Sequence, residues 1–193
     1  MRQGRFVKLR KPEEWDIDFI LNILKDEDYR LFIGGDPLDR DKTLRDHIVR
    51  LAQSGFSYDS NLYLVVDRLS DHKPIGVIFF NRVSWRNRNC TLDLFFLKEE
   101  RGRLDVIDAY LSAVEYVFLE LGLHKVIGYV YAFNTRLIGI HEKLGIRMEQ
   151  RLVEHVFRNG KYHDVLCYGF LESEFKALQN KPIYKFLRKL CRN

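Results

Sequence analysis

The stretch TLDLFFLKEERGRL, residues 91–104, begins the part of the chain that decides the fold, and FNTRLIGIHEKLGI, residues 133–146, ends it. Its first seven residues are apolar apart from Asp93 and predict a strand. Apolar residues then recur at helical spacing over residues 105–121, and Gly122 follows at the place of a C-terminal helix cap. The pattern therefore predicts a strand, a charged turn and a long helix in succession.

A second strand and a second helix complete this part of the chain. Residues 125–131 are rich in Val, Ile and Tyr, which favours a strand. Asn134 is suited to cap a short helix that ends at Gly145. When a helix connects two neighbouring strands of one sheet, the strands run parallel. We therefore expect a β-loop-α-β-α unit with a parallel pair of strands.

The charged turn, residues 98–103, joins the first strand to the long helix and contains one glycine. Free backbone N–H groups and the helix dipole favour negative charge at a helix N-terminus. The sequence therefore predicts that a phosphate-bearing ligand binds at residues 101–106. Glu99 and Glu100, in the same turn, are expected to be solvated.

Length and composition indicate a globular protein with a sizeable core, since the chain has 193 residues, of which 46% are hydrophobic and 31% charged. No stretch approaches the roughly 20 apolar residues of a membrane span. The three cysteines are scattered and odd in number, which predicts reduced thiols and a cytoplasmic location. The spacing of zinc ligands is absent, so no metal is expected.

The net charge of +5 is concentrated at the end of the chain. Residues 175–193 contain six Lys and Arg residues and no acid, so the remainder is close to neutral. We therefore expect no nucleic-acid binding. The chain is divided into a domain, residues 1–175, and a basic helical tail, residues 176–193. Two alternatives are open for the tail: packing on the domain, or docking on an acidic partner or membrane surface.

The other predicted elements flank the central unit. Helices are predicted at 13–25, with Trp15 facing inward, and at 42–53, with a loop at 33–37 between them. Asn159 and Gly160 form a strong hairpin signal. The strands are expected at 6–10, 62–66, 75–80, 148–157 and 165–171, and residues 83–97 are expected to cross a turn at 87–89.

The element order resembles the GNAT acyltransferase fold over residues 5–175. Three stretches carry the resemblance: 116–126, 134–146 with its EKLGI ending, and the late hairpin at 159–164. The resemblance implies an α/β fold, namely a mixed, mostly antiparallel sheet with a central parallel β-α-β unit and helices on both faces. It also implies an acyl-CoA-dependent N-acetyltransferase that uses acetyl-CoA.

A narrower resemblance concerns residues 76–85, Cys90 and His141. These look like the amino-sugar N-acetyltransferases of pseudaminic acid biosynthesis. The primary amine that accepts the acetyl group would then be the 4-amine of a UDP-linked amino sugar. Two alternatives are a ribosomal-protein or peptide N-terminal acetyltransferase and a non-catalytic GNAT-like module that binds a partner. A homodimer is also left open.

The resemblance assigns roles to particular residues. His141 would lie near the sulfur of acetyl-CoA and protonate the leaving thiolate. Asp93 is the leading candidate for the base because it is a carboxylate in an otherwise apolar strand. Each has a structural alternative: a helix-face histidine bonded to a carbonyl, and a carboxylate paired with Arg86 or Arg88. Trp85 and Tyr162 would stack on the acceptor or simply pack. Acetyl-CoA would contact Leu94, Phe95, Phe96, Leu97, Arg101, Gly102, Arg103, Leu104, Asp105, Val106 and Asn134.

One departure from the family pattern lies in residues 101–106, which we call the phosphate loop. The two later glycines of the pattern are replaced by Leu104 and Val106, and Asp105 adds a negative charge between them. A leucine forced into a left-handed conformation costs about 1–2 kcal/mol. Three outcomes stay open: acetyl-CoA binding with altered geometry, a different acyl carrier, or lost activity.

Overall fold

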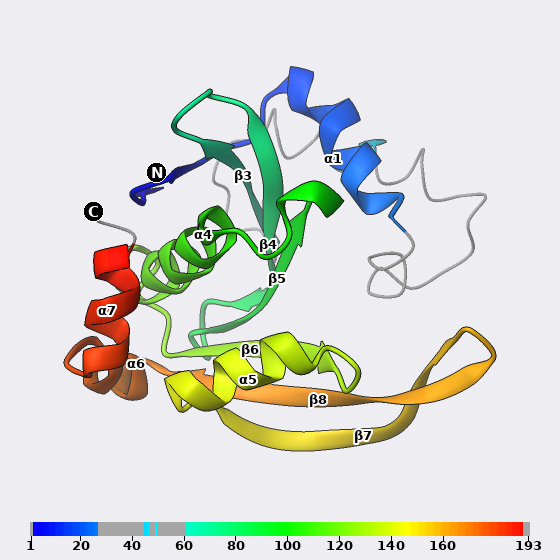
Figure 1. Cartoon of the computed structure of the whole chain (residues 1–193), viewed down its shortest axis with the longest axis vertical. Coiled ribbons are helices and arrows are strands. Elements are labelled where there is room, and N and C mark those ends of the chain that lie inside the picture. Colours follow the sequence, from blue (N-terminus) through cyan, green and yellow to red (C-terminus); the bar gives the residue numbers. More distant parts are fainter. Residues whose placement is uncertain (1, 27–44, 47–48, 50–60, 191–193) are drawn as a thin grey trace.

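The strands form one eight-stranded sheet in a computed structural model that describes residues 2–26, 45–46, 49 and 61–190 (Figure 1). Their order across the sheet is β1-β2-β3-β4-β5-β6-β8-β7. The strands are β1 (Arg2–Gln3), β2 (Val7–Arg10), β3 (Leu62–Arg68), β4 (Pro74–Ser84), β5 (Asn89–Phe96), β6 (Lys125–Tyr131), β7 (Arg147–Arg158) and β8 (Lys161–Leu171).

Helices lie on both faces of this sheet, as predicted. They are the 3₁₀ turn η1 (Glu14–Asp16), α1 (Ile17–Leu24), the 3₁₀ turn η2 (Lys98–Glu100), α4 (Leu104–Glu115), the π-helical turn η3 (Tyr116–Glu120), α5 (Thr135–Leu144), α6 (Glu172–Gln179) and α7 (Pro182–Leu190).

The predicted central parallel pair is confirmed. β5 and β6 run parallel and are paired from Asn89 with Lys125 to Thr91 with Ile127. Every other neighbouring pair is antiparallel. Beyond these residues β5 stays paired with β4, and β6 stays paired with β8. The two strands therefore diverge in the middle of the sheet, and Figure 1 shows them running in different directions.

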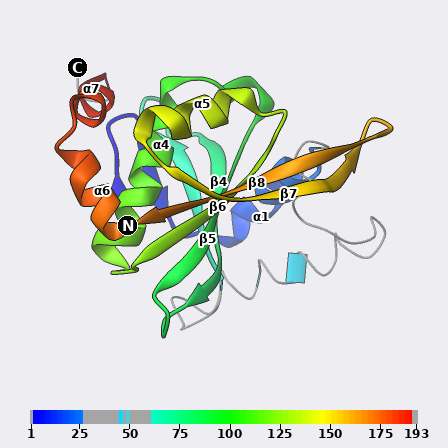
Figure 2. The ribbon, with the colours of Figure 1, turned by 90° about the horizontal axis from the view of Figure 1, so that it is seen from below.

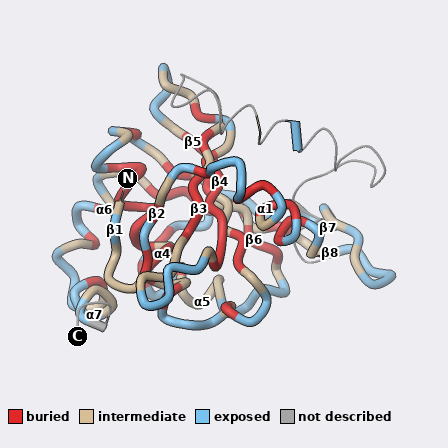
Figure 3. The backbone as a smooth tube through the Cα atoms, turned by 90° about the horizontal axis from the view of Figure 1, so that it is seen from above, coloured by how far each residue is buried: buried red, intermediate tan, exposed pale blue. Residues whose placement is uncertain are grey.

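Alternation along the strands gives each sheet face its own core. The main core cluster joins residues such as Leu64, Ile78 and Phe96 to α4, η3, α6 and α7. The second core cluster joins Val77 and Phe95 to α1 on the other face. Side chains of successive strand residues point to opposite faces, so a one-residue step moves a side chain from one core to the other. Figure 3 shows the buried residues concentrated along the central strands.

The predicted helix ends are confirmed by their backbone geometry. The Asn134 side chain accepts a hydrogen bond from the Leu137 N–H at the start of α5. Gly145 and Gly122 have φ values of 74° and 63° at the ends of α5 and η3, in the left-handed region that favours glycine. The π-helical turn was not predicted; it is closed by a bond from Leu121 N to the Tyr116 carbonyl.

The predicted hairpin is also present, with Asn159 and Gly160 at positive φ between β7 and β8. β7 is the last strand of the sheet, and the hairpin projects from the body of the molecule (Figure 2). Its pairing with β8 shifts between Leu152 and Val156, where Glu154 has a φ of 49°. The hairpin is therefore bent by a bulge in its outer strand.

In the N-terminal helical region, the buried face of α1 was predicted correctly, but the position of Trp15 was not. Trp15 was expected to face inward but is 73% exposed, because it lies in the 3₁₀ turn before α1 rather than in the helix itself. Ile20 and Ile23 of α1 are buried as expected. The loop predicted at residues 33–37 lies outside the described residues, and so does most of the helix predicted at 42–53.

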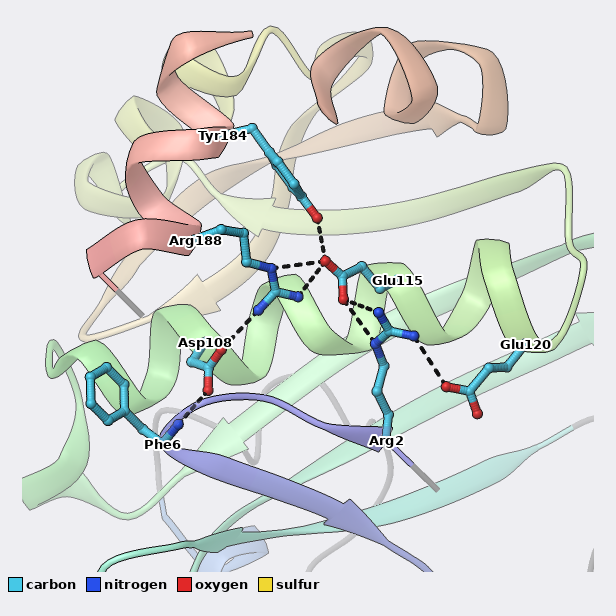
Figure 4. Close-up of polar contacts among 7 residues, drawn as sticks. All are labelled: Arg2, Phe6, Asp108, Glu115, Glu120, Tyr184 and Arg188. Carbon is cyan, nitrogen blue, oxygen red and sulfur yellow. Dashed lines mark hydrogen bonds and ion pairs between the residues drawn. The ribbon is translucent and has the colours of Figure 1, made fainter. Parts of the chain in front are cut away.

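The basic tail is part of the domain. The predicted boundary at residues 175 and 176 falls inside α6, and α7 packs against α4. Arg188 of α7 forms ion pairs with the buried side chains of Asp108 and Glu115 on α4, and its Nη1 lies 2.9 Å from Asp108 Oδ1 (Figure 4). Arg2 and Tyr184 also donate to Glu115. We call these five residues the α4 clamp. In the described chain, α7 therefore packs on the domain.

Candidate active site

The centre of the candidate site is the place where β5 and β6 diverge. Past Thr91 and Ile127, the described chain pairs β5 only with β4, so one edge of β5 has no partner strand there. Gly128 is the first β6 residue beyond the paired region, and a Cβ built on it would meet no atom within 4 Å. An opening of this kind suits an extended ligand that pairs with a strand edge.

The residues predicted to hold the pantetheine arm line this edge. Leu94, Phe95 and Phe96 belong to β5, whereas Leu97 lies just beyond it and donates its N–H to the Ile75 carbonyl at 3.1 Å. Phe95 and Phe96 bury their rings in opposite cores. Their contribution to the opening therefore comes from the backbone.

The phosphate loop has a single residue in the left-handed region. Gly102 has a φ of 92°, whereas Leu104 and Val106 begin α4 with ordinary negative φ values. The strain expected at Leu104 is therefore absent. The Val106 N–H is bonded to the Arg103 carbonyl at 3.2 Å, so it is engaged within the helical turn.

The charged side chains of this loop are largely paired, some within the loop and some with other parts of the chain. Arg101 donates to Asp26 at 2.6 Å, and Arg103 lies 3.3 Å from both Glu100 and Asp105. The prediction that Glu100 is solvated is wrong, because it is only 7% exposed and bonded to an arginine of β3. Burial of a carboxylate demands such a partner. Glu99 is exposed as expected.

Arg136 was missed by the sequence analysis. It lies in the first turn of α5, and its Nη2 donates to the Gly102 carbonyl at 2.9 Å. Its guanidinium lies so close to Gly102 that a Cβ there would collide with it. An exposed arginine thus covers the loop from a second helix. The sequence signal that could have identified Arg136 was its position two residues after the Asn134 cap, because the first turn of α5 lies next to the loop.

His141 is buried between two helices and a strand. It is 5% exposed, its ring centroid lies 4.5 Å from that of Tyr168 on β8, and its Nε2 lies 3.4 Å from the Tyr110 hydroxyl on α4. Burial lowers the pKa of His141 to about 4. The ring is therefore neutral at pH 7, which argues against the expected proton transfer from an imidazolium to the thiolate.

Asp93 lies on the opposite face of β5, toward the second core cluster. Its Oδ2 accepts a hydrogen bond from Asn81 Nδ2 at 2.8 Å. Burial raises the pKa of Asp93, although the Asn81 bond and the charge of Arg82 oppose the rise. The alternative pairing with Arg88 is wrong, because Arg88 donates to the Gly122 carbonyl at 2.8 Å. A carboxyl group with a raised pKa is suited to accept a proton.

The two aromatic candidates are not brought together. Trp85 lies in the turn between β4 and β5 and packs against the main core cluster. Tyr162 is 63% exposed near the tip of the β7–β8 hairpin, where its ring packs on Phe157. Burial, and to a smaller extent the charge of Asp93, raises the pKa of Tyr63 and of Tyr131, so both lie within electrostatic reach of this carboxyl group. Neither tyrosine was predicted, because their proximity depends on strand order.

Among the described residues, no group of three or more His, Cys, Asp or Glu side chains is arranged to hold a metal ion. In the same part of the chain, no helix is long and apolar enough to cross a membrane. The arrangement that remains is an opening flanked by a phosphate loop, a buried histidine on one face and a carboxyl group on the other.

Comparisons with known proteins agree with this geometry. A family model described as acetyltransferase (GNAT) domain matches residues 7–147. The uncharacterized N-acetyltransferase YokL of Bacillus subtilis is 33% identical over 107 residues, which cover 55% of this chain and 60% of that protein. The spermidine N(1)-acetyltransferase of Vibrio cholerae is 24% identical over 167 residues, covering 86% of this chain and 94% of that protein.

A solved structure extends the comparison to three dimensions. The spermidine N-acetyltransferase of Vibrio cholerae in complex with CoA and spermine superposes with a TM-score of 0.77 at 23% identity, over 88% of this chain and 98% of that one. The expected fold is confirmed. These relatives give no support to the amino-sugar branch that residues 76–85, Cys90 and His141 suggested.

Proposed function

Because the chain belongs to the GNAT acetyltransferase family, it transfers an acetyl group from acetyl-CoA to an amine, and we propose that the acceptor is a small cationic primary amine of the polyamine type. The observation that carries the proposed site is the end of β5–β6 pairing at Thr91 and Ile127. It leaves a strand edge free in the middle of the sheet, between a phosphate loop and two ionisable side chains.

In this proposal acetyl-CoA lies along the free edge of β5, with its pyrophosphate at the N-terminus of α4. Gly102 lets the backbone turn at that point, and Arg136 adds a positive charge from α5. Arg103 is partly neutralised by Glu100 and Asp105. Asn134 holds the first turn of α5, and thereby Arg136, in place.

The proposed chemistry is a direct attack of the amine on the thioester, which acetyl-CoA supplies. Asp93 accepts a proton from the amine on the α1 face of the sheet. His141 lies beside the sulfur on the other face, where a neutral ring offers a hydrogen bond rather than an acid proton. The thiolate is a fair leaving group, with a thiol pKa of about 8.5, so this assistance is modest.

Asp93 also supports a cationic acceptor. An ammonium group that approaches the amine site meets a carboxylate whose charge reaches Tyr63 and Tyr131. Carboxylates and aromatic faces both attract ammonium ions. The name of the Vibrio cholerae relative points to the same class of acceptor.

Parallel assays with equal acetyl-CoA test the acceptor. We expect spermidine to give a higher kcat/KM than a UDP-linked 4-amino sugar or a peptide N-terminus. Asp93→Asn should lower kcat by roughly 10²- to 10⁴-fold, the usual range for a lost general base. Glu99→Gln, an exposed carboxyl change nearby, is the control. Preference for the sugar or the peptide would overturn the acceptor class, and absence of acetyl-CoA binding by calorimetry would overturn the site.

A further inference from the structure

The hydroxyl of Tyr110 and the ring of His141 form an isolated polar pair within the main core. In the described part of the chain, Tyr110 has no hydrogen-bond partner other than His141 Nε2, at 3.4 Å. The other ring nitrogen of His141, Nδ1, is buried and has no partner among these residues. A buried polar atom left without a partner costs free energy and calls for an explanation.

The tautomer of His141 follows from counting donors and acceptors. A neutral imidazole carries one proton, on either nitrogen. If Nε2 carries it and donates to Tyr110, both the phenolic proton and the Nδ1 lone pair are left unused. If Tyr110 donates to Nε2, only the Nδ1 N–H is left unused. The second arrangement leaves fewer buried groups unsatisfied and is therefore favoured.

The His141 ring lies on the face of the sheet where the space at Gly128 is open, and its Nδ1 is covered in the absence of a ligand. The His141 ring contacts Tyr168, whose register partner on β6 is Gly128. Gly128 is flanked along β6 by Val126 and Val130, which belong to the main core cluster, so its missing side chain would point to the same face as His141. That space is open. A ligand group that enters there from the free edge of β5 reaches the surroundings of His141.

We propose that Tyr110 is a positioning residue that holds His141 as the Nδ1–H tautomer, so that this N–H donates a hydrogen bond to the thioester sulfur as the C–S bond breaks. The inference rests on the proposed function in one respect, which is the location of the thioester next to His141. It adds a residue from the middle of α4 to a site built from β5, β6, α5 and the phosphate loop at the N-terminus of α4.

The step balances without a proton from His141. The amine nitrogen forms a bond to the carbonyl carbon, and the C–S electron pair leaves with sulfur. The nitrogen loses one proton to Asp93, and the thiolate finally takes one proton from solvent. His141 keeps its proton throughout, which agrees with a pKa lowered to about 4, since a ring that rarely becomes imidazolium acts as a hydrogen-bond donor.

Proton-detected ¹⁵N spectra of the full chain test the tautomer directly. The His141 signals are identified by their loss in His141→Asn. We expect the proton on Nδ1 in the unchanged protein and a shift of population toward Nε2–H in Tyr110→Phe. Tyr168→Phe removes a hydroxyl from the same cluster and should leave the tautomer unchanged. A proton on Nε2 in the unchanged protein would overturn the inference.

Kinetics separate positioning from a merely structural role. Asparagine at 141 offers an amide N–H near the place of Nδ1, and this donor does not depend on a tautomer. Tyr110→Phe should therefore lower kcat by roughly fivefold to tenfold in the unchanged protein and have no effect in the His141→Asn background, with KM for acetyl-CoA unchanged in both. An equal loss in both backgrounds would mean that Tyr110 acts only through packing.

The outcomes also distinguish this inference from the proposed function. If His141→Ala retains full turnover, His141 has no part in catalysis, and both the proposed role of His141 and the inference fail. If His141→Ala loses turnover but Tyr110→Phe changes neither the spectrum nor kcat, the proposed role stands and the inference alone fails.

Discussion

The two ends of α4 use the same residue types in opposite ways. At its N-terminus, Arg103 is 57% exposed in its side chain and lies beside Asp105 and Glu100 on the phosphate loop. Along the rest of the helix, Arg188 is 14% exposed and lies between Asp108, one turn into α4, and Glu115 at its C-terminus, whose side chains are 0% and 10% exposed. Both places combine arginine with buried carboxylates, since the side chains of Glu100 and Asp105 are 9% and 11% exposed, and what differs is the exposure of the arginine.

The difference shows that the exposure of the arginine decides the role of the ion pair: it either leaves the arginine available to a ligand or holds two helices together. A pair formed by an exposed arginine contributes little, about 0–1 kcal/mol, because water screens the arginine and its side chain moves freely. A buried pair that loses one partner leaves an uncompensated charge, which costs several kcal/mol. The loop end can therefore exchange its internal partners for a ligand, whereas the clamp end holds the tail on the domain.

Removing the arginine of the α4 clamp should have the largest effect. Arg188→Ala leaves Asp108 and Glu115 buried without their shared cation, so we expect a loss of about 3–5 kcal/mol in the free energy of unfolding. Urea unfolding measures this loss. Lys185→Ala, an exposed change on the same helix, is the control and should stay within about 0.5 kcal/mol. Equal effects of the two changes would show that the clamp does not hold α7.

The same measurement has a defined pH dependence. Burial alone would raise the pKa of Glu115, but hydrogen bonds from Arg188 and Tyr184 lower it below the ordinary value of 4.5. Such a carboxylate stabilises the folded state above its unfolded pKa, and this contribution is lost as the pH falls through the folded pKa. The gap between the unchanged protein and Arg188→Ala should therefore narrow below about pH 4.5.

An intermediate effect is expected at the loop end. Arg136→Ala removes a cation that covers Gly102, so the dissociation constant of acetyl-CoA should rise about tenfold, the cost of one charge-assisted hydrogen bond. Calorimetry measures the change, and the free energy of unfolding should hardly move. Lys143→Ala, at the exposed far end of α5, is the control. A large loss in the free energy of unfolding without a change in acetyl-CoA affinity would mean that Arg136, like Arg188, stabilises the fold and does not bind the ligand.

The smallest effect is expected at Asp105. Its removal releases Arg103 from an internal pair and takes a negative charge away from the anion site, while α4 loses a favourable acid in its first turn. Asp105→Ala should therefore tighten acetyl-CoA binding by roughly threefold at low salt, and the gain should shrink as salt screens the charge. Weaker binding would mean that Asp105 supports the loop more than it repels the ligand.

Patterns of neighbouring residues predicted most of the fold. The parallel pair followed from the succession of strand, helix and strand, and the hairpin turn followed from Asn159 and Gly160. The caps at Asn134 and Gly145 were likewise recognisable, because each depends on one residue and its local backbone. Such features are decided within a few residues of sequence, where propensity and hydrogen bonding agree.

Features that depend on distant partners escaped prediction. Glu100 was expected to be solvated, but it is buried against Arg68, thirty-two positions away in sequence. The site followed the same rule: Arg136 reaches Gly102 from another helix, and Tyr110 reaches His141. A charge-rich turn looks the same in sequence whether its arginines meet carboxylates, carbonyls or a ligand, and only the packing of helices selects among them.

The outer strand β7 has a consequence for the behaviour of the protein at high concentration. Within the described chain, its outer edge has no partner strand, and such an edge is a template for pairing with other molecules. The bulge at Glu154 interrupts the regular row of N–H and C=O groups, and the exposed charged residues Arg147, Glu149 and Arg151 precede it on the strand. Straightening this strand by deleting Glu154 would therefore be expected to favour fibrous or amorphous aggregates, even if acetyl transfer itself were untouched.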